Sequence, residues 1–354
     1  MKTNRLTPIF LSGLFLIIMT ACPKHVEDVE IQDVDISEVK ENTAVLSWAV
    51  SSDAYASVRI ILNNETDLSE SSRTIILNGN TSTSTFLEEL TGLTKYSLTV
   101  ELQDSNSEKL CCSDEKTFKT SCSKVPVKML TRDSYTLRGN IYYLSSWTEK
   151  VPGILMMHGL GEVMAPWPES ETMNMLIARG YACMSFNFRG HSNSEAFDIQ
   201  KFKQDSGGFF LGCDMEAALS CLTAHDIVDP SSIGLMGGSM GGSASVIGNY
   251  FPQVKTSVAL SPVIGSGIPF KNFFPELEQE YLISISYIVA ENDDSGGYDF
   301  PGMSSDLYDI TEEPRKLWII PGIPHHGSSL ATYPGVNDEI VYWFTETMPS
   351  PYTK

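Results

Sequence analysis

The chain has 354 residues, of which 42% are hydrophobic and 19% charged, and its formal net charge at pH 7 is -20. This length allows two domains, and the hydrophobic content is sufficient for a sizeable core. The acidic balance argues against nucleic acid and against an anionic membrane surface as partners, because both would repel the chain. A net negative charge of this size is more typical of an exposed protein, because the charge keeps such a protein soluble.

The first 21 residues are typical of an export signal. Lys2 and Arg5 form a basic start, and the apolar stretch over residues 9–19 is shorter than the roughly 20 residues that span a bilayer. The ending Met19-Thr20-Ala21-Cys22 resembles a bacterial lipobox, with Met19 where that motif usually has Leu. This resemblance implies that residues 1–21 are removed and that Cys22 carries a lipid. A cleaved export peptide without a lipid is the alternative.

We therefore expect an exported protein that a lipid anchors to the membrane of a bacterial cell envelope. Pro23 follows Cys22 in place of the aspartate that marks inner-membrane retention in some bacteria, which favours the outer membrane. Residues 22–28 are mostly polar and are interpreted as a tether.

The other cysteines divide by their surroundings: Cys111, Cys112, Cys122, Cys183, Cys213 and Cys221. Because export permits disulfides, we expect Cys111 or Cys112 to bridge to Cys122. Cys183 and Cys221 lie in apolar runs and are expected to be buried small hydrophobes. No C-x-x-C pair occurs, so a cysteine metal site is not expected.

Residues 29–121 show short alternating runs separated by Asn, Ser, Asp and Gly, without a ten-residue helical period. Strands are predicted over residues 44–50, 57–62, 73–77 and 96–102. About 90 residues with strands at this spacing predict an all-β antiparallel sandwich.

This segment resembles a fibronectin type III domain. Trp48 matches the core tryptophan of the second strand, and residues 90–96 resemble the L-x-P-G-T-x-Y corner, with Gly92 in place of proline and Leu93 in place of glycine. A generic immunoglobulin-like sandwich is the alternative. The segment contains no catalytic constellation, so we expect a spacer, or a weak binding module whose ligand the sequence does not identify.

After a junction at residues 121–125, the pattern over residues 125–350 changes to strands alternating with helices. A hairpin is predicted over residues 127–130 and 135–143. Further strands are predicted over 151–157, 181–188, 232–236, 254–260, 281–290 and 316–320, and helices over 170–179, 214–224 and 336–346. This alternation predicts an α/β fold, a doubly wound and mostly parallel sheet.

A glycine cluster follows the apolar strand at residues 232–236. Gly237, Ser239 and Gly241 form a G-x-S-x-G frame, extended to Gly-Gly-Ser-Met-Gly-Gly. A strand that turns sharply into a helix strains the corner residue and leaves room only for small neighbours. The pattern therefore predicts an exposed serine hydroxyl at the end of a strand.

Other reactive residue types also follow predicted strands. His158-Gly159-Leu160-Gly161 comes after residue 157, Asp293 shortly after residue 290, and His326 shortly after residue 320. With Ser239, the chain order is serine, aspartate, histidine, as in α/β-hydrolases. The segment from 125 to 349 resembles that superfamily, near its dienelactone-hydrolase-like and small-esterase branches. Residues 188–192 resemble the family's R-G-x-G-x-S motif.

The resemblance implies a role for each residue. Ser239 would attack an acyl carbon, His326 would act as base and then acid, and Asp293 would orient His326. The backbone N–H groups of Leu160 and Met240 would face the oxyanion. Dienelactone hydrolases proper use cysteine, so Ser239 places the chain among the serine members.

Two of these assignments have rivals next to them. Asp294 is the alternative acid, and His325 the alternative base. His158 is interpreted as a structural member of the oxyanion turn, and His191 as a residue that braces its loop. A metal site at His325 and His326 is not expected, and no cofactor is implied.

The substrate is predicted only by class. The roughly 20 residues between 260 and 281 are too few for a multi-helix lid, and Phe197, Phe202, Phe209 and Phe210 are expected to form a small apolar rim. An open site of this kind suits short acyl esters or exposed polymer-linked esters. The alternatives are a serine peptidase of the same fold and an inactive envelope binding protein.

Overall fold

The computed structural model describes residues 29–164, 166–204, 208–264, 281–324 and 326–352. The predicted signal peptide, the tether at residues 22–28 with Cys22, and His325 lie outside the described residues. The chain divides into two compact units. The first contains the described residues up to Leu90 together with Thr94–Thr120, and the second contains Thr91–Leu93 and the chain from Ser121 onward.

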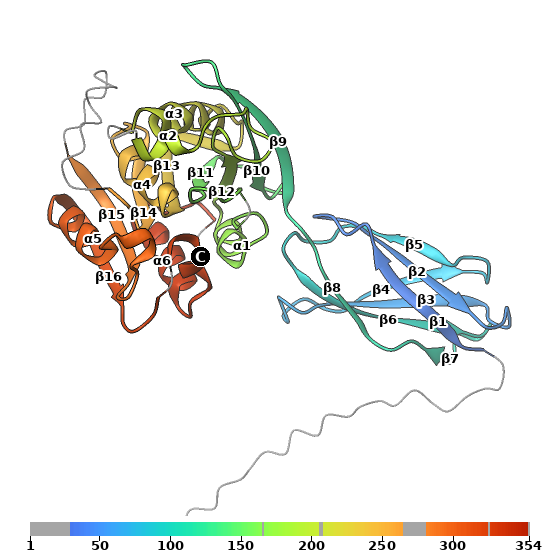
Figure 1. Ribbon diagram of the computed structural model, residues 1–354. Coiled ribbons are helices and arrows are strands. Elements are labelled where there is room, and N and C mark those ends of the chain that lie inside the picture. The colour runs from blue at the N-terminus through green and yellow to red at the C-terminus, as the bar shows by residue number, and fades with distance from the viewer. Residues whose placement is uncertain (1–28, 165, 205–207, 265–280, 325, 353–354) are drawn as a thin grey trace, which may run out of the picture. The chain divides into compact units, whose positions relative to one another are not determined.

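The first unit consists of two antiparallel sheets (Figure 1). One has the order β1 (Ile31–Ser37), β2 (Ala44–Val50), β5 (Ser84–Leu87). The other has the order β4 (Arg73–Asn78), β3 (Ser57–Asn64), β6 (Lys95–Gln103), β7 (Lys109–Cys112), and β8 (Lys116–Lys119) also pairs with β6. The four strands predicted from sequence are β2, β3, β4 and β6, whereas β1, β5, β7 and β8 were missed because they are short or mostly exposed.

The core of the first unit lies between strands with alternating apolar residues. Leu46 and Trp48 of β2 are at most 3% exposed and belong to one cluster with Ile60 of β3 and Leu98 of β6. Because side chains alternate across a strand, the alternation read from the sequence identified the buried face correctly.

The predicted bridge from Cys111 or Cys112 to Cys122 is wrong. Cys111 and Cys122 both carry thiols. Cys111 packs against the core of the first unit, and Cys122 packs against a core of the second. Cys183 is fully buried, as predicted, whereas Cys221 is only half-buried.

The second unit contains an eight-stranded sheet in the order β9, β10, β12, β11, β13, β14, β15, β16 (Figure 1). Strand β10 is antiparallel to both of its neighbours, and all the other neighbouring pairs are parallel. The strands are β9 (Ser123–Leu130), β10 (Thr136–Tyr143), β11 (Val151–Met157), β12 (Ala182–Asn187), β13 (Val228–Gly238), β14 (Val254–Leu260), β15 (Leu282–Ala290) and β16 (Thr311–Ile320). The predicted hairpin and mostly parallel sheet are confirmed.

Helices cover both faces of this sheet. They are α1 (Glu171–Ala178), α2 (Gln200–Gln204), α3 (Phe209–Thr223), α4 (Met240–Gly248), α5 (Phe300–Asp309) and α6 (Val336–Thr347), with 3₁₀ turns η2 (Ser295–Gly297) and η3 (Gly327–Thr332). Helix α3 begins at Phe209 rather than at the predicted Asp214. The sequence did not show this start because the residue before it, Gly208, has no side chain that could cap the helix. Helix α5 was not predicted, although Asp299 caps it and proline stands in its first turn.

No helix in the described part of the chain is long and apolar enough to cross a membrane.

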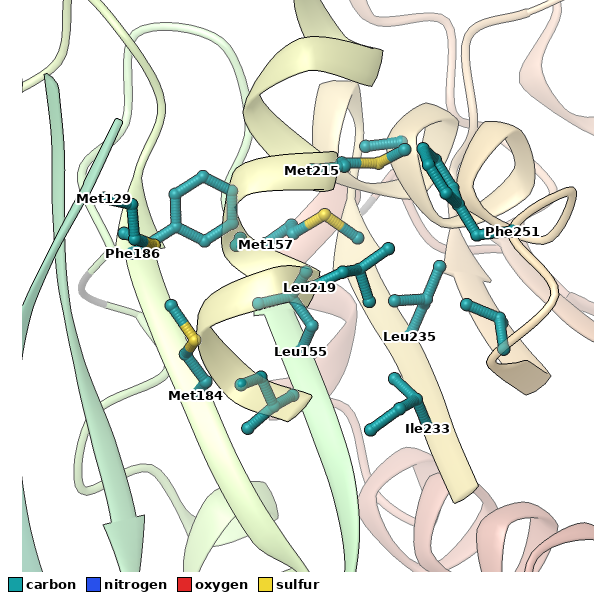
Figure 2. Packing of buried hydrophobic residues seen from close by; sticks show 14 of the residues in the cluster. Met129, Leu155, Met157, Met184, Phe186, Met215, Leu219, Ile233, Leu235 and Phe251 are labelled. Carbon is teal, nitrogen blue, oxygen red and sulfur yellow. The ribbon is translucent and has the colours of Figure 1, made fainter. Parts of the chain in front are cut away.

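The core explains the nearly continuous apolar run at residues 151–157. Leu155 and Met157 of β11 pack on one face with Met215 and Leu219 of α3 (Figure 2). Ile154 and Met156 point to the other face, where α1 and α6 pack. A strand that is covered on both faces has no solvent side and therefore no polar alternation.

A buried ion-pair network supports the loop after β12. Arg189 is 0% exposed, and its guanidinium binds Asp214 at 2.7 Å and Asp133 at 2.5–2.8 Å. Partial burial opposes ionisation of Asp133, but hydrogen bonds from Arg189 and Thr131 outweigh it and lower the pKa of that carboxyl. The arginine of residues 188–192 therefore has a structural role.

Two buried histidines join this loop to the loop after β11. Nε2 of His158 accepts the Phe188 N–H at 3.1 Å, so Nδ1 carries the proton and donates to the Gly159 carbonyl at 2.7 Å. Nε2 of His191 accepts the Gly161 N–H at 3.0 Å. Burial lowers the pKa of His158 to about 4 and also lowers the pKa of His191. Both histidines hold their loops in place, as predicted, and their lowered pKa values favour the neutral form.

This histidine geometry predicts acid destabilisation. The pKa of His158 is about 4 in the folded protein, against 6.5 for the unperturbed group, so the unfolded chain binds more protons between these values. His158 therefore contributes about 3 kcal/mol to the free energy of unfolding above about pH 6.5. This contribution is lost as the pH falls toward the folded-state pKa of about 4. We expect the free energy of unfolding, measured in urea from pH 7 to pH 4, to depend less on pH in His158→Gln than in wild type. An equal dependence in both proteins would contradict a neutral structural His158.

Candidate active site

Ser239 occupies a strained corner between β13 and α4. Its backbone has φ 55° and ψ -115°, and it stands immediately before the first turn of α4. A non-glycine residue rarely adopts a positive φ, and such strain is found preferentially at functional sites. The backbone N–H of Ser239 donates to the carbonyl of Leu260, at the end of β14, at 2.9 Å.

The flanking glycines are required by close backbone contacts. A Cβ at Gly237 would lie 2.6 Å from backbone atoms of Gly241 and Met157, and a Cβ at Gly241 would lie 2.3 Å from the Met157 carbonyl oxygen. A Cβ at Gly238 would lie 2.1 Å from the backbone nitrogen of Ser328. The G-x-S-x-G frame is therefore a sharp turn against β11, with the loop after β16 packed directly on it.

Asp293 and His326 form a hydrogen-bonded pair. Asp293 follows β15 and is 3% exposed, and Nδ1 of His326 lies 2.9 Å from each of its carboxylate oxygens. Asp294 is exposed and precedes the η2 turn. Between these two acids, the structure brings Asp293 to the imidazole.

The loop that carries His326 also contacts the serine corner. A Cβ at Gly327, the residue after His326, would lie 3.2 Å from Cβ of Ser239. Among the described residues, the Ser239 hydroxyl forms no hydrogen bond, and therefore none to the imidazole of His326. Catalytic hydrogen bonds of this kind often tighten only when substrate binds.

Phe300 covers one side of the imidazole. It is the first residue of α5 and is 2% exposed, and its ring centroid lies 4.6 Å from that of His326. The imidazole is thus held between the Asp293 carboxylate and an aromatic ring. Helix α5, which was not predicted from the sequence, therefore helps to position His326, which was.

The two predicted oxyanion donors come from different segments of the chain, and Met240 follows Ser239 directly. Met240 begins α4, where helix N–H groups carry partial positive charge. Leu160 lies in the turn after β11, where the Gly161 N–H is bonded to His191 and the Gly159 N–H to Glu162 Oε2 at 2.7 Å. The N–H of Leu160 has no hydrogen-bond partner in the part of the chain that the structure describes.

Two further polar side chains contact the site. Ser261 donates to Asp293 Oδ2 at 2.6 Å and accepts from the Gly327 N–H at 3.2 Å. Glu162 Oε2 accepts both from the Gly159 N–H and from the Ser328 hydroxyl at 3.1 Å, and thereby joins the oxyanion turn to the histidine loop. Ser261 directly follows the predicted strand at 254–260, so the strand-end rule that found Asp293 could have found it too.

The phenylalanines predicted to form an apolar rim belong to one aromatic cluster. Phe197, Phe202 and Phe210 pack on one another with ring centroids 5.0–6.3 Å apart. The guanidinium of Arg189 lies 5.3–5.4 Å from the ring centroids of Phe197 and Phe210. Phe197 and Phe210 therefore lie against the buried guanidinium, because a desolvated guanidinium gains from contact with aromatic faces.

The described residues include no group of three or more His, Cys, Asp or Glu side chains that could hold a metal ion.

No known protein family and no curated protein matches the sequence. Solved structures do match, each over 64% of this chain. They include DcsB in complex with a substrate analogue (15% identity, 100% of that chain, TM-score 0.51), an esterase of Pyrococcus furiosus (17%, 94%, 0.49) and a dienelactone hydrolase of Anabaena variabilis (18%, 99%, 0.46). At these identities the likeness concerns the fold. Together with the strand order, the likeness to DcsB shows that the second unit has an α/β fold built on a mostly parallel sheet.

Proposed function

We propose that the protein is a serine hydrolase that cleaves carboxylic esters through an acyl-enzyme on Ser239. The observation that carries this proposal is the Asp293–His326 pair, hydrogen-bonded at 2.9 Å, together with the packing of the loop that carries His326 against the Ser239 turn. A serine hydroxyl is a poor nucleophile until an imidazole accepts its proton, and the imidazole needs a carboxylate to fix its tautomer.

The reaction follows from these positions. Ser239 Oγ attacks the acyl carbon while its proton passes to Nε2 of His326, and the resulting oxyanion is stabilised by the N–H groups of Leu160 and Met240. The ester C–O bond then breaks, and the proton on His326 passes to the leaving alcohol. Water attacks the acyl-enzyme with His326 again as base, which releases the acid and restores Ser239. Asp293 accepts the hydrogen bond from Nδ1–H of His326 and thereby keeps the imidazole oriented.

The rest of the chain fits an exported enzyme in this proposal. Residues 1–21 would be the export signal, with Cys22 as lipid anchor on a bacterial cell envelope. The first unit would be a fibronectin type III-like spacer, which its two antiparallel sheets and the buried Trp48 and Tyr96 support. The ester would be a small soluble molecule or would be linked to an exposed polymer.

Removal of the nucleophile should abolish turnover. We expect Ser239→Ala to lower kcat/KM for nitrophenyl acetate by at least about 10³-fold, since the remaining groups bind but cannot form an acyl-enzyme. Steady-state kinetics on folded variant and wild type test this. Wild-type protein that is folded but inactive toward esters and peptides would favour a binding protein.

The neighbouring acids and histidines provide matched controls. Asp293→Asn should lower kcat by about 10³–10⁴-fold because it removes the carboxylate that fixes the imidazole tautomer, whereas Asp294→Asn should stay near wild type. His326→Ala should likewise be inactive, and His325→Ala active. If the Asp294 and His325 variants were inactive toward the same ester and the other two active, the catalytic acid and base would be Asp294 and His325.

The acyl-chain preference tests the substrate class. We expect soluble short-chain nitrophenyl esters to be hydrolysed faster than emulsified long-chain triglycerides, because the roughly 20 residues between 260 and 281 are too few for a multi-helix lid that would cover a long acyl group. Initial rates at matched ester concentrations decide this. A preference for emulsified triglyceride would overturn the proposed substrate class but not the serine mechanism.

A further inference from the structure

We propose that Ser261 is a positioning residue that acts on the catalytic reaction through Asp293. This inference rests on the proposed serine hydrolase function. Ser261 lies at the carboxyl end of β14, between the strand that carries Ser239 and the strand that precedes Asp293. Its side chain is 0% exposed.

The hydroxyl of Ser261 forms hydrogen bonds both to the acid and to the histidine loop. It donates its one proton to Asp293 Oδ2 at 2.6 Å, and its oxygen accepts the Gly327 N–H at 3.2 Å. A hydroxyl has one donor and two acceptor positions, so this geometry satisfies both contacts together. Ser261 thus fixes the distance between the acid and the residue that follows His326.

The adjacent residue extends the same support to the nucleophile. The carbonyl of Leu260 accepts the Ser239 N–H at 2.9 Å, while the N–H of Ser261 donates to the Ile288 carbonyl of β15 at 3.0 Å. Consecutive residues on one strand end therefore bond to the backbone of the serine and to the side chain of the acid. A displacement of this strand end would move both.

Burial makes the hydroxyl important for the carboxylate. Asp293 is 3% exposed, so protein donors must replace most of its water. Besides His326, the donors to the carboxylate among the described residues are the Ser261 hydroxyl at 2.6 Å and the Ser295 N–H at 3.4 Å. A charge-assisted hydrogen bond from Ser261 holds the carboxylate plane so that both oxygens face Nδ1 of His326.

The backbone of Ser261 allows hydroxyl loss to be separated from backbone strain. Its φ is 45°, a region that glycine adopts without cost and alanine does not. Ser261→Ala and Ser261→Gly both remove the hydroxyl, but only the glycine variant relieves the strain. Ser257→Ala, also fully buried on β14 but bonded to Asn249, is the matched control.

The experiment measures kcat and KM for nitrophenyl acetate from pH 5 to pH 9. We expect both Ser261 variants to lose about tenfold in kcat, with KM changed less than about twofold. The acid limb of the profile of kcat against pH should also be displaced in both variants. Ser257→Ala should match wild type. Wild-type kcat and an unchanged acid limb in either Ser261 variant would overturn the proposal.

A double-mutant cycle identifies the route of the effect. If Ser261 acts through the carboxylate, Ser261→Ala should have little further effect on kcat in an Asp293→Asn background. An equal loss in both backgrounds would show a purely structural role and overturn the proposal.

A spectroscopic readout separates this proposal from the proposed function. The Nδ1–H proton resonance of His326 should move in Ser261→Ala and not in Ser257→Ala. If Ser239→Ala retains hydrolysis, the serine mechanism fails, yet a displaced resonance would still support Ser261 as the residue that positions the Asp293–His326 pair. An unchanged resonance would contradict that positioning whether or not the protein hydrolyses esters.

Discussion

The close backbone approach at the Ser239 turn is the constraint on which the site depends. The carbonyl of Met157, at the end of β11, comes so near to Gly237 and Gly241 that neither position tolerates a Cβ. Ser239 is consequently held at a positive φ at the start of α4. Such a conformation persists only when the surrounding structure over-determines it, and here a hydrogen bond to Leu260 and the packed loop at Gly327 do so.

The parallel sheet places the remaining groups around this turn. The strands end at one edge, so the loops after β11, β15 and β16 meet beside Ser239. Polar side chains then fix these loops to one another. Glu162 joins the oxyanion turn to the histidine loop, and Ser261 joins the acid to the same loop. Neutral His158 and His191 brace the oxyanion turn without adding charge.

Much of this arrangement could be predicted because strong local patterns specify it. The apolar run at 151–157 and the glycine frame around Ser239 gave the sheet and its sharp turn, and strand endings located Asp293 and His326. Ser261 stands at a strand end and could have been found by the same rule, whereas Glu162 has no distinctive spacing and its role arises only from contacts between loops. The sequence likewise did not show that Arg189 is buried and lies against Phe197 and Phe210, because these contacts arise only in the folded chain.

The most direct test of the central claim is chemical modification of the intact protein by a fluorophosphonate, followed by peptide mapping. This reagent reports an activated serine independently of the natural substrate, so it tests the Ser239–His326–Asp293 arrangement itself. The account predicts a single covalent adduct on the peptide that contains Ser239, absent from Ser239→Ala. Folded wild-type protein that forms no adduct, or forms it at another serine, would contradict it.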